Sequence, residues 1–503
     1  MKVYFRVDAS IHIGSGHVMR CLSLANQLQK SGYDIVFVIR PQNGDLSAYI
    51  AELGYKVIKL NRLNTFTSPR STDDYKSWLQ VTEIQDAKEF LSIALDAEIV
   101  VVDHYGINLA WEEFVKSSIT CKLVVIDDLL RQHNADLIID QTYGVDPNEY
   151  LSHSAVKYVL TGSEYALLNT QFSVFHKLAV EERKAKNTHK LMISMGGVDK
   201  PNATLKVLEA LSMRETKFDT TVLLSERAPH FHSVSSFCKG NEDWVRHITF
   251  SENMAELMLK HTIAIGAPGS TSWERTCIGL PSILIPLAEN QKKICDTLVS
   301  EKAVLSLSLN EISKKLKTKL DELLLNFEDM RKKNLEICDG LGTKRVVTAI
   351  RCLNVGEVTL KKATAENIRQ VYDWQSLPQT RRYANDTRVP TWSDHKAWMQ
   401  EKLKSDSDFF YIINFDDHDV GVIRLDQTCP KRYLISIYIS PIYFGKGIAK
   451  KALSVIDILH PNIEIIAEVL EANIASQTLF KAAGYKREKN NLFIRGRFEN
   501  YND

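Results

Sequence analysis

The sequence predicts an α/β protein with two doubly wound, Rossmann-like halves followed by an α+β domain. In the first third of the chain, short runs rich in valine and isoleucine alternate with amphipathic segments, which is typical of buried parallel strands joined by helices; examples are "YDIVFVIR" and "AEIVVVDHYG". A second series of this kind begins near Lys190 with "HKLMISMGG". From Val358 onward, runs such as "DVGVIRLD" and "YLISIYIS" alternate with polar turns, a pattern that favours antiparallel strands.

Three domains are therefore expected, and the length of 503 residues agrees with more than one. The first half would span residues 1–165 and carry a histidine loop, and the second half would span residues 166–353 and bind UDP. The third domain would cover residues 357–503, after a boundary near Asn354–Glu357. Two doubly wound halves in series place a ligand cleft between the carboxyl ends of their strands.

Composition argues against several classes of function. The formal net charge is +1, which favours neither a nucleic acid partner nor a membrane surface. No apolar run approaches the ~18 residues of a membrane span, and charged residues interrupt the N-terminus where a signal peptide would be apolar. The eight cysteines are scattered with no CxxC pair, which predicts reduced thiols and no zinc site. We expect a cytoplasmic protein that uses no metal.

The first candidate site is the loop "IHIGSGHVMR", which joins the first strand to the first helix. A Walker loop needs a lysine that is missing here, and a dinucleotide fingerprint needs a glycine where Met19 stands. His17 begins the helix, and the positive end of the helix dipole disfavours a charged imidazolium. A neutral histidine there can take a proton from water. The alternative is that His17 only caps the helix, and spacing alone does not separate the two.

The wider stretch "FRVDASIHIGSGHVMRCLSLA" resembles the UDP-sugar hydrolases of the pseudaminic acid pathway, which act on UDP-2,4-diacetamido-2,4,6-trideoxy-β-L-altropyranose. The resemblance continues through "VVDHYG", "IDD", "YALL", "SMGG" and "DGLGTKR", and covers about residues 1–352. It implies a glycosyltransferase-B-like fold in which His17 is the general base for water. Water would attack the anomeric carbon with inversion and cleavage of the C–O bond. The matching residues of the first loop are Arg6, Asp8, Gly14, Gly16, His17 and Arg20.

Three further residues of this region bear on the substrate. We expect Tyr105 to orient the substrate, and Asp8, near the end of the first strand, to orient either His17 or the substrate. Asn169 follows "YALL" at a place where the resemblance predicts an arginine. That departure puts one substrate contact in doubt.

The second candidate site is "GAPGSTSWERTCIGLPSILIPLAENQ", residues 266–291. A strand ends in a Gly/Pro turn and a helix starts, so that free backbone N–H groups favour a diphosphate. The spacing resembles the UDP site of glycosyltransferase-B enzymes, including the lipid-intermediate N-acetylglucosaminyltransferase of peptidoglycan synthesis, which implies that Glu274 holds the ribose. The alternative for Glu274 is helix stabilisation by an acid in the first turn, and for Gly196 and Gly197 an ordinary strand-to-helix turn. The expected contacts with UDP and sugar are Gly14, Gly16, Arg20, Gly196, Gly197, Ser270, Thr271, Glu274, Asn290 and Gln291.

The third domain carries "ISIYISPIYFGKGIAKKAL", a glycine turn between a strand and a helix. It resembles the acyl-CoA pyrophosphate loop of GNAT N-acetyltransferases, [QR]xxGx[GA], although Phe444 replaces the first residue. The later stretch "VLEANIASQTLFKAAGYKRE" resembles the next GNAT motif, and "VYDWQSLPQTRRYANDT" resembles members that acetylate amino sugar nucleotides. Phe480 stands where a tyrosine often protonates the leaving thiolate, so that role is absent or lies elsewhere. The expected acetyl-CoA contacts are Gly445, Lys446, Gly447, Ile448, Ala449, Asn473 and Ser476.

Together these resemblances predict a bifunctional sugar-nucleotide enzyme. The GNAT domain would use acetyl-CoA to acetylate the 4-amino group of a UDP-4-amino-4,6-dideoxy-altrose derivative. The N-terminal pair would hydrolyse the diacetamido product to UDP and a free sugar for nonulosonic acid synthesis. Three alternatives remain: transfer of the sugar to an acceptor, acetylation of proteins or small amines, and sugar-nucleotide binding without catalysis.

Overall fold

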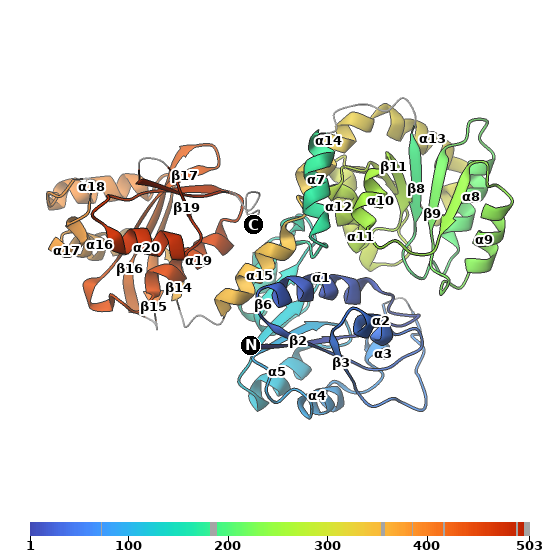
Figure 1. Cartoon of the computed structure of the whole chain (residues 1–503), viewed down its shortest axis with the longest axis horizontal. Helices are drawn as coiled ribbons and strands as arrows, with labels where there is room; N and C mark the ends of the chain where they lie inside the picture. The colour runs from blue at the N-terminus through green and yellow to red at the C-terminus, as the bar shows by residue number, and fades with distance from the viewer. Residues whose placement is uncertain are drawn as a thin grey trace. The chain divides into compact units, whose positions relative to one another are not determined.

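The computed structural model describes residues 1–71, 73–181, 189–353, 358–384, 386–415, 418–488 and 491–496, apart from the side chain of Cys352. The chain forms two compact units, Met1–Val347 and Thr348–Asp503 (Figure 1). The boundary expected at residues 354–357 lies outside the described residues. In the described parts of the chain, no helix is long and apolar enough to cross a membrane.

The first half of unit 1 is a seven-stranded parallel sheet in the order β3-β2-β1-β4-β5-β6-β7. The order reverses between β1 and β4, and α1 starts directly after β1, so its N-terminus lies at the topological switch point where such sheets bind ligands. The strands are β1 (Lys2–Val7), β2 (Asp34–Ile39), β3 (Lys56–Lys59), β4 (Ile99–Asp103), β5 (Lys122–Ile126), β6 (Asn134–Asp140) and β7 (Ala155–Thr161). The helices are α1 (Gly16–Lys30), α2 (Ser47–Glu52), α3 (Lys76–Leu79), α4 (Glu83–Leu91), α5 (Leu109–Ser118) and α6 (Pro147–Leu151).

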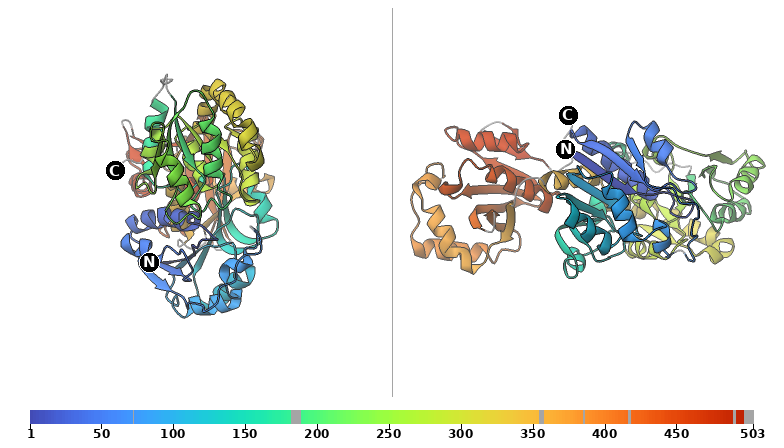
Figure 2. Two further views of the ribbon diagram at one scale, coloured as in Figure 1. Left: turned by 90° about the vertical axis from the view of Figure 1, so that its right-hand side faces the viewer. Right: turned by 90° about the horizontal axis from the view of Figure 1, so that it is seen from below.

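The second half of unit 1 is a six-stranded parallel sheet in the order β10-β9-β8-β11-β12-β13, and its switch point lies between β8 and β11. Along β8, Leu191 and Ile193 join one apolar core and Met192 joins another, because helices cover both faces (Figures 1 and 2). The strands are β8 (Lys190–Ser194), β9 (Asp219–Leu223), β10 (Val245–Ile248), β11 (Ile263–Gly266), β12 (Ser282–Leu284) and β13 (Val304–Ser306). The helices are α7 (Gln171–Glu181), α8 (Ala203–Ser212), α9 (Phe231–Lys239), α10 (Met254–Leu259), α11 (Ser270–Cys277), α12 (Asn290–Ser300), α13 (Ile312–Leu325), α14 (Phe327–Ile337) and α15 (Gly342–Leu353).

Two of the sequence motifs, "YALL" and "DGLGTKR", pack against each other at the junction of the two halves. The Thr343 hydroxyl donates to the carbonyl of Leu168 at 2.7 Å, and Arg345 donates to the carbonyl of Glu164 at 2.8 Å. At Gly342 the chain passes so close to Ala166 that a Cβ atom would lie 2.5 Å from the Ala166 nitrogen. This glycine is therefore required by a close backbone approach.

Unit 2 is built on one seven-stranded mixed sheet in the order β14-β15-β16-β17-β18-β20-β19. The predicted antiparallel pattern is confirmed for the four strands from β14 to β17, whereas β17 and β18 run parallel. Their pairing stops at Leu434, five residues before β17 ends at Ile439, so the two strands separate there. The strands are β14 (Val358–Lys362), β15 (Phe409–Phe415), β16 (His418–Cys429), β17 (Arg432–Ile439), β18 (Glu464–Glu468), β19 (Lys486–Arg487) and β20 (Leu492–Arg495), and the helices are α16 (Ile368–Gln375), α17 (Pro378–Arg381), α18 (Trp392–Lys402), α19 (Ile448–Leu459) and α20 (Ile474–Ala482).

We predict that Gly342→Ala destabilises unit 1. The new methyl group would overlap the backbone of Ala166, and overpacking of this kind costs about 1–3 kcal/mol. Gly240→Ala is the matched control, because a Cβ atom there would meet its nearest neighbour at an ordinary 3.6 Å. Urea unfolding of both variants gives the free energies of unfolding. Equal stability of the two variants would contradict the close approach at Ala166.

Candidate functional site

His17, the second residue of α1, is held by a buried carboxylate. Its Nδ1 lies 2.6 Å from Oδ1 of Asp103, the last residue of β4. Burial alone would raise the pKa of Asp103, but the charge of Arg20 and the bonds from Arg20 and His17 hold that pKa well below its usual value. Because an ionised carboxylate only accepts hydrogen bonds, we assign the imidazole hydrogen to Nδ1. In neutral His17, Nε2 then carries the free electron pair.

Arg20 lies one helical turn after His17 and pairs with two carboxylates. Its Nε and Nη2 donate to Asp103 at 2.7 and 2.8 Å, and its Nη1 donates to Oδ2 of Asp128 at 2.5 Å. The Tyr105 hydroxyl also donates to Asp128 Oδ2, at 2.9 Å. The other oxygen of Asp128, Oδ1, is buried and makes no hydrogen bond to a described residue. Such an orphaned acceptor fits a hydroxyl or amide donor of a ligand.

Aromatic rings surround His17 on the remaining side. Tyr105 packs edge-on against the imidazole at a centroid distance of 4.6 Å, and Trp78 does so at 6.0 Å. Trp78 also stacks on Tyr105, and Tyr75 contacts both rings. His17 is only 8% exposed as a result. These rings form an aromatic wall beside the imidazole.

Asp8 does not orient His17, which corrects the expectation from the sequence. Both carboxylate oxygens of Asp8 accept from Arg6, at 2.6 and 2.9 Å, and His104 Nε2 lies 3.2 Å away. Asp8 and Arg6 are completely buried. The ring of His17 instead meets Asp103, because β4 pairs with β1 and ends at Asp103, beside the loop that leads from β1 to α1. Asp8 therefore belongs to the charged core beneath the loop.

The loops of the two halves meet beside His17. A Cβ atom at Gly16 would lie 3.7 Å from the hydroxyl oxygen of Ser270, and one at Gly197 would lie 3.3 Å from that of Ser15. Gly14 and Gly196 both have positive φ, at 81° and 85°. The first loop thus faces the glycine turn after β8 and the start of α11 after β11. The predicted grouping of these three segments is present in the structure.

The start of α11 presents free donors and one unusual carboxyl group. No side chain caps α11, and the N–H groups of Ser270 and Thr271 in its first turn are available to an anion, whereas that of Ser272 donates to the carbonyl of Gly269. In Glu274, Oε2 is buried and makes no hydrogen bond within the described part of the chain. Burial raises the pKa of Glu274 to about 7, and the charge of Arg275 offsets only part of that rise. A ribose with two vicinal hydroxyl groups fits this acceptor.

Asn290 and Gln291 open α12, and neither contacts His17 in the structure. Gln291 Oε1 accepts from the backbone N–H of Leu287 at 2.8 Å, which braces the turn before the helix. Burial raises the pKa of Tyr75, which belongs to the aromatic wall. The side chain of Asn169 is exposed and accepts from the N–H of Gln171, at the start of α7. A sugar-pocket role for α12 stays a prediction.

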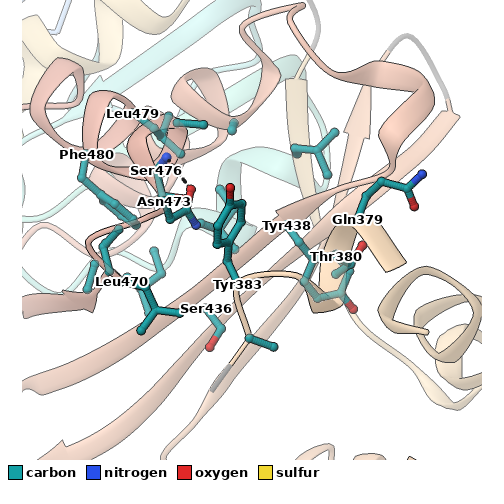
Figure 3. A pocket seen from close by; sticks show the side chains of 18 of the residues that line it. Gln379, Thr380, Tyr383, Ser436, Tyr438, Leu470, Asn473, Ser476, Leu479 and Phe480 are labelled. Carbon is teal, nitrogen blue, oxygen red and sulfur yellow. Dashed lines mark hydrogen bonds between the residues drawn. The ribbon is translucent and has the colours of Figure 1, made fainter. Parts of the chain in front are cut away.

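Unit 2 contains a cavity of about 830 Å³ where β17 and β18 separate (Figure 3). Of the predicted acetyl-CoA contacts, six line the cavity: Gly445, Gly447, Ile448, Ala449, Asn473 and Ser476. Gly445 and Gly447 adopt φ values of 77° and 73°, so the turn before α19 requires glycine at both. Lys446 is not among the residues that line the cavity. Its ammonium group lies 5.1 Å from the centroid of the Tyr443 ring instead.

Helix α20 lines the cavity with Asn473, which caps the start of the helix, and with the apolar side chain of Phe480. Asn473 Oδ1 accepts from the N–H of Ser476 at 3.1 Å, and the Asn473 side-chain nitrogen makes no hydrogen bond to a described residue (Figure 3). Phe480 also lines the cavity, while its ring packs on Tyr485 at 5.0 Å. At the other end of the cavity, the polar atoms Thr380 Oγ1, Arg381 Nε and Gln375 Oε1 are buried without a described partner. This end of the cavity suits a polar molecule that receives the acetyl group.

The sequence did not identify Asp103 and Asp128 as part of the site, although it contained "VVDHYG" and "IDD". An aspartate at a strand end is usually a satisfied loop residue, and only the pairing of β4 beside β1 brings Asp103 to α1. Among the described residues, no group of three or more His, Cys, Asp or Glu side chains is arranged to hold a metal ion. The seven cysteines whose side chains are described form no disulfide with one another.

Family models match the second half of unit 1 and most of unit 2. The glycosyltransferase family 28 C-terminal domain matches residues 169–342, and the acetyltransferase (GNAT) domain matches residues 357–486. An uncharacterized protein of Methanocaldococcus jannaschii is 26% identical over 510 residues, which is 97% of each chain. UDP-2,4-diacetamido-2,4,6-trideoxy-beta-L-altropyranose hydrolase of Campylobacter jejuni is 28% identical over 259 residues, which is 51% of this chain and 81% of that protein.

A spore coat polysaccharide biosynthesis protein of Bacillus subtilis is 23% identical over 368 residues, which is 71% of this chain and 100% of that protein. The predicted fold class is confirmed: two Rossmann-like halves of the glycosyltransferase-B type are followed by a GNAT-like mixed sheet. The chain is thus a homologue of the UDP-diacetamido-altropyranose hydrolase over about half of its length, and it matches the models of a glycosyltransferase family 28 C-terminal domain and of an acetyltransferase (GNAT) domain.

Proposed function

We propose that this protein catalyses two consecutive steps on one UDP-sugar. Unit 2 transfers an acetyl group from acetyl-CoA to the 4-amino group of a UDP-4-amino-4,6-dideoxy-altrose derivative. Unit 1 then hydrolyses the diacetamido product to UDP and the free sugar, which serves nonulosonic acid synthesis. The observation that carries the hydrolase proposal is the His17–Asp103 pair beside the uncapped start of α11. The similarity to the Campylobacter hydrolase supports the choice of substrate.

Hydrolysis by unit 1 follows from the order of these groups. Asp103 accepts the Nδ1–H of His17, so Nε2 takes a proton from water. The resulting hydroxide equivalent attacks the anomeric carbon, the C–O bond to the diphosphate breaks, and the electron pair leaves on UDP. The N-terminus of α11 stabilises the charge that develops on the diphosphate. Arg20 keeps Asp103 ionised, which stabilises the imidazolium as it forms.

Acetyl transfer by unit 2 follows from the two ends of its cavity. The amides between Gly445 and Ala449 bind the pyrophosphate of acetyl-CoA, because the turn precedes α19 and aims N–H groups outward. The opposite end, at α17, holds the amino sugar through its unpartnered polar atoms. The amine nitrogen then attacks the thioester carbonyl, and CoA leaves as the thiolate. Fusion of both steps in one chain raises the local concentration of the intermediate.

We predict that the two activities separate by mutation. His17→Ala and Asp103→Asn each lower UDP release by about 10²–10⁴-fold, since each removes the base or its orienting acceptor. Both variants retain acetylation of the UDP-4-amino sugar, measured as CoA release. Thermal unfolding and UDP binding of each variant report whether unit 1 is folded. A folded His17→Ala variant that releases UDP at the wild-type rate contradicts the assignment of the base.

The reciprocal variant is Gly447→Glu. Its carboxylate repels the pyrophosphate of CoA, and φ near 73° strains any side chain, so acetylation falls while UDP release persists. Gly447→Ala is the control that introduces the same backbone strain without the charge. CoA release and UDP release are followed in parallel for both variants. Loss of both activities in folded Gly447→Glu would contradict the proposal that acetylation and UDP release use separate sites.

A third prediction concerns the pH dependence of UDP binding. Glu274, with a pKa raised to about 7, is protonated below that pH, whereas the ionised carboxylate can accept from both ribose hydroxyls. UDP affinity should therefore gain about tenfold from this group between pH 6 and pH 8. Glu274→Gln removes this gain in affinity. The ratio of the UDP affinities of wild type and variant cancels the titration of UDP itself. Calorimetry measures the UDP affinity of both proteins as a function of pH. If the affinity changes with pH by the same factor in wild type and Glu274→Gln, the ribose contact is ruled out.

A further inference from the structure

The acetyltransferase cavity lacks a proton donor at the place where the GNAT pattern supplies one. Phe480 occupies that position on α20, lines the cavity and is 4% exposed. Its ring packs on Tyr485 and Phe493, so it serves the apolar core. A phenyl ring cannot protonate a thiolate. If unit 2 releases CoA as proposed, the leaving sulfur needs a donor from another element.

Tyr383 presents a hydroxyl from the opposite wall of the same cavity. It follows α17 by two residues and lines the cavity. Figure 3 shows its ring standing across the opening, with the hydroxyl directed toward Asn473 and Ser476 on the α20 side. The guanidinium of Arg382 lies 5.3 Å from the centroid of this ring. In Figure 3 the hydroxyl of Tyr383 lies between Thr380 on one side of the cavity and Asn473 of α20 on the other.

Other hydroxyl groups of the cavity are placed less well. The Tyr438 oxygen is shielded from solvent, and Figure 3 places that residue by Thr380, away from α20. Tyr443 lies beside the CoA loop, where its ring contacts Lys446. Ser436 accepts from Arg424 at 3.4 Å and, like every serine, is a far weaker acid than a phenol. Of the described hydroxyls that line the cavity, Tyr383 combines acidity with a central position.

We propose that Tyr383 protonates the CoA thiolate, replacing the donor that is missing at Phe480. This inference rests on the proposed acetyl transfer by unit 2. The amine nitrogen forms a bond with the thioester carbonyl, and the C–S bond of the tetrahedral intermediate breaks. The electron pair goes to sulfur, which takes the phenolic proton, and the phenolate regains a proton from water. The amine loses its proton to solvent, so the products are the acetamide and CoA thiol.

The decisive variant is Tyr383→Phe, and the control is Tyr433→Phe on β17, which is not among the residues that line the cavity. We expect kcat with acetyl-CoA to fall by about 10²-fold in Tyr383→Phe, with little change in KM for acetyl-CoA. Tyr433→Phe should stay close to wild type. The double variant Tyr383→Phe/Phe480→Tyr should recover much of the rate, because it returns a phenol to the opposite wall.

The leaving group separates proton donation from a structural role. With p-nitrophenyl acetate as acetyl donor, nitrophenolate leaves without a proton, so Tyr383→Phe should match wild type within about threefold. Equal loss with both donors, or an unchanged kcat with acetyl-CoA, overturns the assignment. Hydroxylamine serves as a second acceptor that needs no sugar recognition. Activity with hydroxylamine but not with the UDP-4-amino sugar counts against the proposed substrate, while the variant ratios still test Tyr383.

Discussion

The buried carboxylate of Asp103 is the group on which the site in unit 1 depends. A charge that is completely removed from water is tolerated only when it is paired and hydrogen-bonded, and Arg20 and His17 provide those partners. The two partners are three residues apart on α1, so they share one face of the helix and reach the same carboxylate. The hydrogen bond from His17 to Asp103 therefore also fixes the orientation of the imidazole ring and its tautomer.

Topology brings the remaining groups to the same place. Each sheet of unit 1 reverses its strand order once, and the loops after β1, β8 and β11 leave the sheets at those two reversals. The loop at Gly16 lies beside Ser270, and Gly197 allows a close approach to Ser15. A base from one half thus meets an anion-binding helix start from the other half. A base on one side and an anion-binding helix start on the other suit cleavage of a bond between a sugar and a diphosphate.

The sequence predicted many of the strands and the glycine turns, because these features are encoded by local periodicity and by residues with special backbone freedom. It did not predict the partner of His17. Asp103 is 86 residues away along the chain, and only the register that pairs Val7 with Asp103 brings it to α1. Asp8, near the end of the first strand, was expected to orient His17 or the substrate, but Arg6 and His104 bind its carboxylate in the core, so it does not orient His17. The place of Tyr383 likewise depends on how two distant segments enclose one cavity.

Hydrolysis of the UDP-diacetamido sugar in water enriched with oxygen-18 tests the central claim most directly. If His17 activates water for attack on the anomeric carbon, mass spectrometry finds the label in the free sugar and none in UDP. NMR then shows the inverted anomer as the first product. Label in the terminal phosphate of UDP would mean that water attacks phosphorus. That result, or UDP release only when a sugar acceptor is added, would contradict the account.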